Sequence, residues 1–416
     1  MKTARQIALS VALCGAVSFG SGLYENVNQS VHYLRNVARD ASTDVDAVYS
    51  NPAGTAFLKD GWHVSANSQM FFQSRTIDTK FVNGTSREYE GETFVPSMPS
   101  LLAAWHRGNL ALSGAFTIAG GGGSVEYDDG IPMFDAITLA STAAAGAPKT
   151  LHEVGGSASL EGTSYIYGLS FGVAYRFIPS LSAYVGARGN YQSNSYSAKA
   201  TVPGMGKVSL DVDQTGWGVT PIVGLTFQYD RLTLGTKFEY NSSIEVENDS
   251  DVPAAFAAQL ADFKDGAKVD ADIPSYFAFG VRYDLLSGAN LHASLGYRHF
   301  FDYWADYAGD REHYCGGTNE YVVGLEWDID SRWTVSAGGQ FTRYGLKDKS
   351  ISEMNFNNDG NTIGFGGAFR PVEWMRINVA YFHTFYEDYK GDKEAYGKNT
   401  YSRTNDAIGL GLDFDI

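Results

Sequence analysis

The sequence predicts an all-β fold, a transmembrane antiparallel up-and-down β-barrel of about 14 strands with an N-terminal helical hatch (plug) in the lumen. Three observations support this prediction: the pattern of the C-terminal segment, its recurrence along the chain, and the alternation of short and long connections. In the segment 407–416, small or acidic residues alternate with apolar ones, which are Ile408, Leu410, Leu412, Phe414 and Ile416. Because successive side chains of a strand point to opposite faces, this strand has one apolar face. An open edge of this kind aggregates in water, whereas in a closed barrel its apolar face meets lipid.

The same alternation recurs in windows of strand length from Trp62 onward. The clearest window runs from Tyr165 to Phe177, where aromatic and aliphatic residues alternate with mostly small ones. All windows together give about 14 strands, and a bacterial single-chain barrel needs an even number. The expected strands are 62–72, a less regular one that ends near 105, 110–118, 165–177, 181–191, 217–229, 232–240, 277–283, 291–297, 321–327, 333–341, 363–369, 375–385 and 407–416.

Connections between these windows alternate between tight turns and long loops. The tight turns are rich in Gly, Pro, Asn, Asp and Ser, as turn geometry requires; they lie at 107–109, 178–180, 230–231, 286–290, 330–332 and 371–374. The long loops are expected at 74–92, 119–163, 193–210, 241–273, 301–318, 345–360 and 386–402. Barrels of the bacterial outer membrane have short periplasmic turns and long extracellular loops. We therefore expect an outer-membrane location with both termini in the periplasm.

Residues 1–22 have the pattern of a secretory signal peptide. Lys2 and Arg5 precede a short apolar run and then small residues,. The apolar run is too short to span a bilayer as a helix. We therefore expect the mature chain to begin near residue 23, and the barrel to comprise residues 62–416.

Residues 23–61 lack strand alternation and carry signals of short helices. Thr43 and Asp46 are spaced as a capping box, and Asn51 precedes Pro52 at an expected first helical position,. Irregular backbone cannot face lipid, so this segment lies either in the periplasm or in the lumen. A barrel of this size has room for a plug, which favours a hatch in the lumen.

The segment from Arg39 to Gly54 resembles the hatch of the FadL-like outer-membrane proteins, which transport long-chain fatty acids or aromatic hydrocarbons. The shared feature is an acidic, Ala-rich stretch that leads into Asn51, Pro52, Ala53 and Gly54, and the first three match the N-P-A motif of the family. The resemblance implies a monomeric channel for uptake of hydrophobic compounds past a hatch. It also implies that the ligand leaves sideways, through a gap at a kinked third strand. Transport is expected to be passive and without a cofactor, since no nucleotide-binding pattern is visible.

A run of glycines follows the third expected strand. The run consists of Gly120, Gly121, Gly122 and Gly123. Glycine weakens strand pairing and marks bulges or bends. The run therefore either helps to open a lateral gap in the wall or is the flexible start of a long loop.

Two long loops carry apolar residues near helical spacing. One set follows Pro132 and the other follows Pro253; the residues are Phe134, Ile137 and Leu139, and Phe256, Leu260 and Phe263. Exposed apolar faces usually mark binding surfaces. We interpret the two sets as a groove that captures a hydrophobic molecule outside the cell. Alternatively, the two helices pack on each other.

The net charge of -16 argues against a nucleic-acid partner, which requires a basic surface,. The acids either are solvated in loops or hold divalent cations near lipopolysaccharide, which we expect as a neighbour together with outer-membrane lipid. Several basic residues are expected to face the lumen, where they either line a path for a carboxylate or pair with Glu239, Glu326 and hatch acids. These residues are Arg176, Arg188, Lys237, Arg282 and Arg376.

We predict no catalytic residue and no metal site. Gly168 to Gly172 spell G-x-S-x-G, but Ser170 lies in mid-strand, whereas a nucleophile elbow needs a strand-to-helix turn,. The alternatives to a hydrophobic-compound channel are a non-specific porin, a receptor or an adhesin. A lipid hydrolase is a weaker alternative. The sequence does not distinguish fatty acids from aromatics as ligands.

Overall fold

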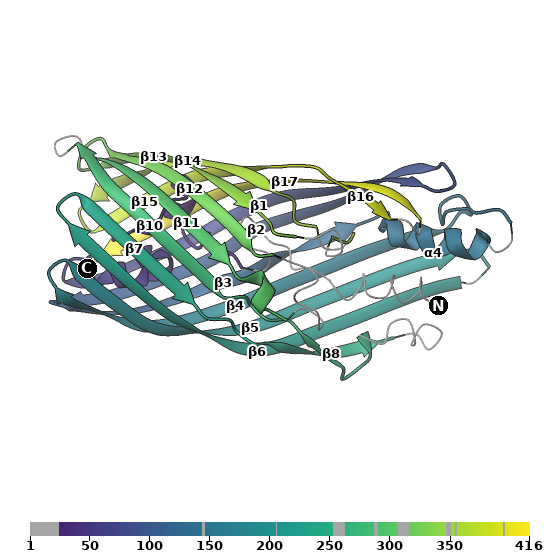
Figure 1. Cartoon of the computed structure of the whole chain (residues 1–416), viewed down its shortest axis with the longest axis horizontal. Helices are drawn as coiled ribbons and strands as arrows, with labels where there is room; N and C mark the ends of the chain where they lie inside the picture. Colours follow the sequence, from purple (N-terminus) through teal and green to yellow (C-terminus); the bar gives the residue numbers. More distant parts are fainter. Residues whose placement is uncertain are drawn as a thin grey trace.

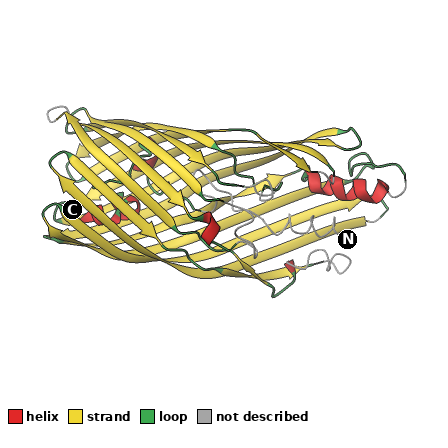
Figure 2. Ribbon diagram, in the orientation of Figure 1, coloured by secondary structure: helices red, strands yellow, loops and turns green. Residues whose placement is uncertain are grey.

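A closed antiparallel β-barrel with a small helical segment inside it forms the molecule (Figures 1 and 2). The computed structural model describes residues 25–143, 146–204, 206–252, 263–286, 290–306, 316–346, 351–353, 356–393 and 396–416. The expected signal peptide lies outside the described residues. In the described part of the chain the sheet has 17 strands, of which 14 form the closed wall. The predicted barrel of about 14 strands is therefore confirmed.

The wall closes because its first and last strands pair. β1 (Gly61–Phe81) and β17 (Gly397–Asp415) are antiparallel from His63↔Asp415 to Phe81↔Gly397. The other wall strands, each antiparallel to its neighbours, are β2 (Ser86–Arg107), β3 (Leu110–Tyr127), β4 (Ser157–Ile178), β5 (Leu181–Val202), β6 (Gly206–Tyr229), β7 (Leu232–Glu239), β10 (Tyr276–Leu286), β11 (Leu291–Phe300), β12 (Thr318–Asp328), β13 (Trp333–Arg343), β14 (Gly360–Val372) and β15 (Met375–Tyr386).

Three short strands continue the wall outward. β8 (Glu245–Asp251) pairs with β6, which also pairs with β7. β9 (Lys268–Asp270) pairs with β8, so β8 and β9 extend the neighbouring pair β7 and β10. β16 (Tyr389–Lys393) pairs with β17 beyond β15. The tight turns and the C-terminus lie at one end of the barrel, and α4 (Pro132–Ala143) lies at the other (Figure 1). A 3-10 helix, η4 (Asp302–Trp304), follows β11.

The wall is taller on one side than on the other. β1 to β6 and β17 have 18–24 residues each, whereas β10 to β15 have 10–13. Roughly 9–11 residues suffice to cross an outer membrane, so the long strands extend beyond it. The expected loops at 74–92 and 193–210 were wrong, because these ranges are strand except for turns near Gly84 and Gly204. Outside the lipid both faces of a strand can be polar, and the apolar alternation then disappears.

Outward-facing side chains form an apolar belt around the barrel. Exposed hydrophobic residues follow one another at every second position, for example from Tyr167 to Phe177 on β4 and from Trp217 to Tyr229 on β6. Such an area is unfavourable in water and favourable in lipid. Aromatic residues at the ends of both stretches fit the interfacial girdles of membrane barrels. None of the described helices is both long and apolar enough to cross a membrane.

Residues 25–60, which we name the hatch segment, lie inside the half of the barrel near the C-terminus (Figures 1 and 2). They contain α2 (Val31–Arg35), α3 (Ala47–Ser50) and the 3-10 helix η1 (Pro52–Phe57). Pro52 opens η1 as predicted. The expected capping box is absent from this described segment, because Asp46 is itself the N-cap residue of α3 and makes no side-chain cap bond.

Glycines on the lumenal face allow the hatch segment to approach the wall closely. A Cβ atom on Gly235 would overlap the backbone oxygen of Asp40, and one on Gly280 would lie 2.6 Å from the backbone nitrogen of Ala41. Other glycines against the hatch segment are Gly296, Gly324, Gly338, Gly364 and Gly409. The hatch segment therefore rests on the backbone of the wall, which accounts for part of the 47 glycines in the chain.

Candidate functional site

Buried charges join the hatch segment to the wall in three clusters. In the first, Arg298 of β11 donates to both carboxylate oxygens of Asp40, at 2.9 and 3.1 Å, and to the carbonyl oxygen of Val37 at 2.6 Å. Glu320 of β12 lies 3.3 Å from the same guanidinium. Arg298 is only 1% exposed. Because removal of one partner leaves a buried charge uncompensated, a pair of this kind holds its two segments together firmly.

In the second cluster the wall supplies the acid. Glu326 of β12 lies 2.5 Å from Arg35 and 3.8 Å from Arg39 of the hatch segment. Arg39 also pairs with Asp44 and Asp46, each at 2.7 Å. Burial alone would raise the pKa of Asp46, but the guanidinium of Arg39 holds this pKa below its usual value. The Asp46 carboxylate is therefore ionised, as its pairing with Arg39 requires.

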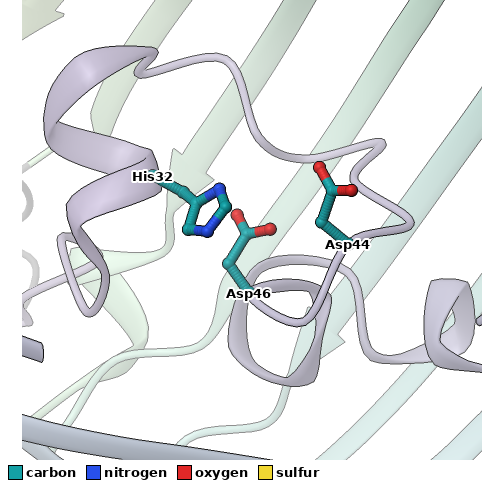
Figure 3. A group of neighbouring side chains, drawn as sticks. All are labelled: His32, Asp44 and Asp46. Carbon is teal, nitrogen blue, oxygen red and sulfur yellow. The ribbon is translucent and has the colours of Figure 1, made fainter. Parts of the chain in front are cut away.

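His32, Asp44 and Asp46 bring possible metal ligands within 4.8 Å of one another (Figure 3). However, one terminal nitrogen of Arg39 donates to both aspartates at 2.7 Å. His32 is bound to Asp413 of β17 at 2.8 Å. Since Arg39 already supplies the positive charge that a cation would provide, we interpret this group as part of the ion-pair network.

The third cluster lies at the start of the hatch segment. Arg188 of β5 pairs with Glu239 of β7 at 2.7 Å and donates a hydrogen bond to the carboxyl group of Glu25 at 3.2 Å, and Lys237 pairs with Glu239 at 2.8 Å. Burial and the charge of Glu239 raise the pKa of Glu25 to about 8. The interpretation that Arg188 and Lys237 pair with acids is confirmed.

Two other basic residues from the sequence prediction lie elsewhere. Arg282 is 3.8 Å from Asp284 on its own strand. Arg176 donates to the carbonyl oxygen of Gly108 at a tight turn, at 2.8 Å. The guanidinium carbon of Arg176 also lies 5.7 Å from the ring centroid of Phe57, so Arg176 contacts the end of the hatch segment.

The segment Asn51–Gly54 contacts the lumenal side of β5 and β6. Thr226 donates to Asn51 at 2.9 Å, and Ser182 donates to the carbonyl oxygen of Ala53 at 2.6 Å. The side-chain amide of Asn51 donates to Ser42 at 2.8 Å. Pro52 is buried at the start of η1, and a side chain on Gly54 would overlap Ser42. Asn51 thus links the hatch segment both to itself and to the wall.

The hydrogen-bond ladder between β2 and β3 is interrupted. The strands pair from Arg107↔Leu110 to Leu101↔Phe116 and again at Glu92↔Glu126, whereas 93–100 and 117–125 do not pair with each other. On β2 this stretch contains Pro96 and Pro99, which lack a backbone N–H,. We name this interruption the wall gap.

The four predicted glycines lie on the β3 side of the wall gap. Gly121 and Gly122 have φ angles of +64° and +121°, a left-handed region that other residues rarely adopt,. The register of the pairing between β3 and β4 shifts twice, once between Ile118 and Gly120 and once between Gly121 and Gly123. The six residues 118–123 are all buried in succession. Gly120–Gly123 therefore interrupt the regular geometry of β3, and they lie within the strand rather than at the start of a loop.

The hatch segment occupies the hydrogen-bonding positions that β2 leaves open. The side chain of Asn26 donates to Ile118 and Gly121, at 3.2 and 2.7 Å, and its backbone N–H donates to Ala119 at 2.8 Å. The side chain of Gln29 donates to Ile118 at 2.8 Å. On the opposite side, Ser100 of β2 donates to the carbonyl oxygen of Gln29 at 2.5 Å. Residues 26–29 thus bridge the two strands.

A cavity of about 1070 Å³ opens at the wall gap. It is lined from β2 by Phe94, Pro96 and Ser97 and from β3 by Gly123 and Ser124, among others. Its volume is comparable to that of small-molecule pockets, which are roughly 300–1,000 Å³. On the outer face of β2, exposed acids at 88, 90 and 92 lie above exposed apolar residues that begin at Phe94. The wall gap therefore begins where the apolar belt of β2 begins.

The predicted capture residues lie at the outer end of the barrel. Leu139 of α4 is buried among aromatic residues of the outer lumen, Phe134 is half-buried against the same cluster, and Ile137 is exposed. Phe263 is buried against β5 and β6, and Met133 of α4 packs on both clusters. Phe256 and Leu260 lie outside the described residues. The described side chains line the outer mouth but do not form one open apolar face.

The fold, the apolar belt and the internal segment define a class of protein: a plugged β-barrel of the bacterial outer-membrane type. The structure is similar to that of a Pseudomonas aeruginosa FadL homologue, with a TM-score of 0.69 and 13% identity over 96% of this chain and 100% of the other. It is also similar to the Pseudomonas putida toluene transporter TodX, with a TM-score of 0.60 and 13% identity over 90% of this chain and 95% of the other. For the Ralstonia pickettii toluene transporter TbuX the TM-score is 0.55, with 13% identity over 89% of this chain and 94% of the other.

At these identities the similarity establishes the shared fold. The similar structures are of transporters and channels rather than enzymes. No protein-family model matches the sequence, and no curated protein matches it.

Proposed function

We propose that this chain is a passive outer-membrane channel for hydrophobic compounds, in which the hatch segment closes a lateral exit. The observation that carries the proposal is the wall gap, which Asn26 and Gln29 bridge in place of strand pairing. In a continuous barrel the wall is a closed ladder of strong hydrogen bonds that a ligand cannot cross. Here a few side-chain hydrogen bonds from a separate segment close it, and these can be released without unfolding any strand.

The route begins at the outer mouth, where α4 and Phe263 present apolar side chains near the outer lumen. It continues through the outer lumen to the hatch segment and leaves through the wall gap into the bilayer. Each buried methylene contributes about 0.8 kcal/mol, so an apolar ligand is held firmly until the hatch segment moves. The C-terminus then lies on the periplasmic side, at the end with the tight turns, whereas the described chain begins at Glu25 in the lumen.

The similar structures support a hydrophobic cargo, since two of them are of toluene transporters and one is of a FadL homologue. The described ion pairs hold the hatch segment inside the lumen of this barrel, where buried side chains block the pore. This arrangement argues against an open porin. We therefore expect low ion conductance in planar bilayers. Steady high conductance would favour the porin alternative.

Uptake by cells tests the lateral exit. Ser97 and Ser124 line the cavity from opposite strands, so Ser97→Trp with Ser124→Trp should fill it and slow the uptake of radiolabelled hexadecanoate or toluene. Ser193→Trp is the matched control, because Ser193 lies on β5 where both neighbouring strands pair continuously. Equal uptake by the double variant and the control, with both barrels folded, would exclude the wall gap as the exit.

A further inference from the structure

The cavity at the wall gap is acidic. Seven carboxylates and no Lys, Arg or His side chain are among the described residues that line it. Two of the seven contact a basic side chain, since Asp129 pairs with Arg87 at 3.2 Å and Asp406 lies 2.7 Å from His383. Within the described part of the chain no salt bridge neutralises the other five, which are Glu88, Glu90, Glu92, Glu126 and Asp128. The cavity therefore carries a net negative charge.

These acids come from both sides of the wall gap. Glu92 of β2 and Glu126 of β3 are direct partners, at the one position of the described ladder where the two strands meet again above the unpaired stretch. Both side chains are exposed. Like charges directly opposite on neighbouring strands repel. A cationic group placed between them would be attracted by both carboxylates and would relieve this repulsion.

Buried oxygen atoms beside the same gap have no donor. Thr93 of β2 lines the cavity and is 4% exposed, and its hydroxyl has no hydrogen-bond partner among the described residues. On the lumenal side Asn26 donates to Ile118 and Gly121, but its Oδ1 atom is buried without a partner. The Oδ1 atom of Asn28 is also buried without one. Because a buried acceptor without a donor is costly, these atoms favour a ligand that brings N–H groups.

Apolar surface begins directly beside the acids. Phe94 and Pro96 of β2 line the same cavity, and Phe94 is 58% exposed on the outer face. Its ring stacks on that of Phe72 of β1, with the two centroids 5.1 Å apart. The cavity therefore has an anionic end and an apolar end. This arrangement is complementary to an amphiphile with a cationic head and a hydrocarbon tail.

We propose that the wall gap binds the ammonium head of hydrophobic amines, and that Glu92 and Glu126 select such cations over hydrophobic acids. The proposal rests on the proposed uptake function and specifies a substrate class that the lateral exit favours. An ammonium group has three N–H donors and no acceptor, which matches the carboxylates and the unpartnered oxygen atoms. Rings of Asp and Glu select cations in channels by the same attraction. A carboxylate head is repelled at this position, and a hydroxyl head gains little.

Binding to the purified full chain in a non-ionic detergent tests this selectivity. Dodecylammonium, 1-dodecanol and dodecanoate share one tail and differ in the charge of the head, and all three are measured by calorimetry at a pH of about 7. We expect dodecylammonium to bind at least about tenfold more tightly than dodecanoate, with dodecanol between them. The difference should shrink as the ionic strength rises from about 0.05 M to about 0.5 M, because salt screens exposed charges.

The double variant Glu92→Gln with Glu126→Gln should reduce the preference for the amine to about twofold and leave the affinity for dodecanol within about twofold of the original. Without ligand its melting temperature should be equal or higher, because repulsion is removed. A lower one would contradict the repulsion on which the site depends.

Asp213→Asn with Asp249→Asn is the matched control. These exposed aspartates are direct partners on β6 and β8, so the control removes the same charge from the same kind of facing pair elsewhere on the outer wall. It should keep the full preference for the amine. An equal loss of preference in both double variants would show attraction to the net charge alone and would overturn the site.

The remaining outcomes separate this proposal from its alternatives. If Mg²⁺ alone displaces dodecylammonium at similar concentration, the acids take a free cation and the amphiphile assignment fails. If dodecanol binds but the amine and the acid bind equally well, the substrate class is wrong and the uptake function remains. If none of the three compounds binds the unmodified chain, the uptake function itself fails, and the substrate class falls with it.

Discussion

Releasing Asn26 and Gln29 from β3 should open the wall gap and leave the rest of the barrel folded. The double change Asn26→Leu with Gln29→Leu removes four side-chain hydrogen bonds, three to β3 and one from Gln29 to the backbone of Asn26. At about 1 kcal/mol for each of the three bonds to β3, docking of this segment weakens by about 3 kcal/mol,. Since 1.4 kcal/mol is about a factor of ten, the open fraction rises about 10²-fold.

Amide hydrogen exchange measures this opening directly. Peptides that cover 25–30 and 117–125 should exchange faster by up to the same factor, whereas β4 and β5 should be unaffected, because local opening controls exchange region by region. Asn28→Leu is the matched control, since it removes one bond, to Gln69 of β1, and should cost only about 1 kcal/mol,. Unchanged exchange in the double variant, or a change no larger than that in Asn28→Leu, would refute the assignment of these two residues as the closure of the wall gap.

Three further predictions concern the seating of the hatch segment. Arg298→Met leaves Asp40 buried without its main partner and should destabilise docking by about 3–5 kcal/mol. Adding Asp40→Asn to this variant should recover part of the lost stability in thermal melts. If the stability losses of the two single variants simply add in the double variant, Arg298 and Asp40 are not coupled. Gly235→Val should displace the hatch segment and expose it to protease while the barrel keeps its heat-dependent gel mobility, whereas Gly189→Val, whose nearest neighbouring atom lies 3.9 Å from the added Cβ, should do neither. In the docked state Glu25 keeps its proton up to a pH of about 8, whereas in the undocked segment it loses the proton near pH 4.5. Docking of the hatch segment should therefore weaken as the pH rises through this interval. Opening of residues 25–30, measured by hydrogen exchange, should increase with pH in the original chain and should not do so in Glu25→Gln.

The apolar period of two was sufficient to predict the wall within the lipid, because there one face must be apolar. It failed where the strands continue outside the membrane, as at 74–92, since both faces are then solvated or packed on polar partners. The irregularity of the second expected strand was a real signal. It reflects Pro96 and Pro99, which interrupt pairing with β3.

The hatch and its motif were located by sequence, but the contacts that hold it were not. Pairs such as Arg298–Asp40 and Arg35–Glu326 join residues separated by more than two hundred positions, and no local spacing reveals them. The close seating on Gly235 and Gly280 was equally hidden, because a glycine on the lumenal face of a strand resembles any other small residue. The only sequence signal for Asn26 and Gln29 is that both carry side-chain N–H donors, which could bond to unpaired strand carbonyl groups at a break in the wall.

If molecules leave by the proposed lateral exit, the height of the wall gap on β2 sets their orientation. The unpaired residues begin just beneath the acidic side chains at 88, 90 and 92 and continue beside the apolar stretch from Phe94 to Leu101. A molecule with a hydrophilic end can therefore slip into the outer leaflet tail first, with that end still among hydrated headgroups. The molecule is then aligned with the neighbouring lipids, and its charged end does not cross the hydrocarbon core of the bilayer.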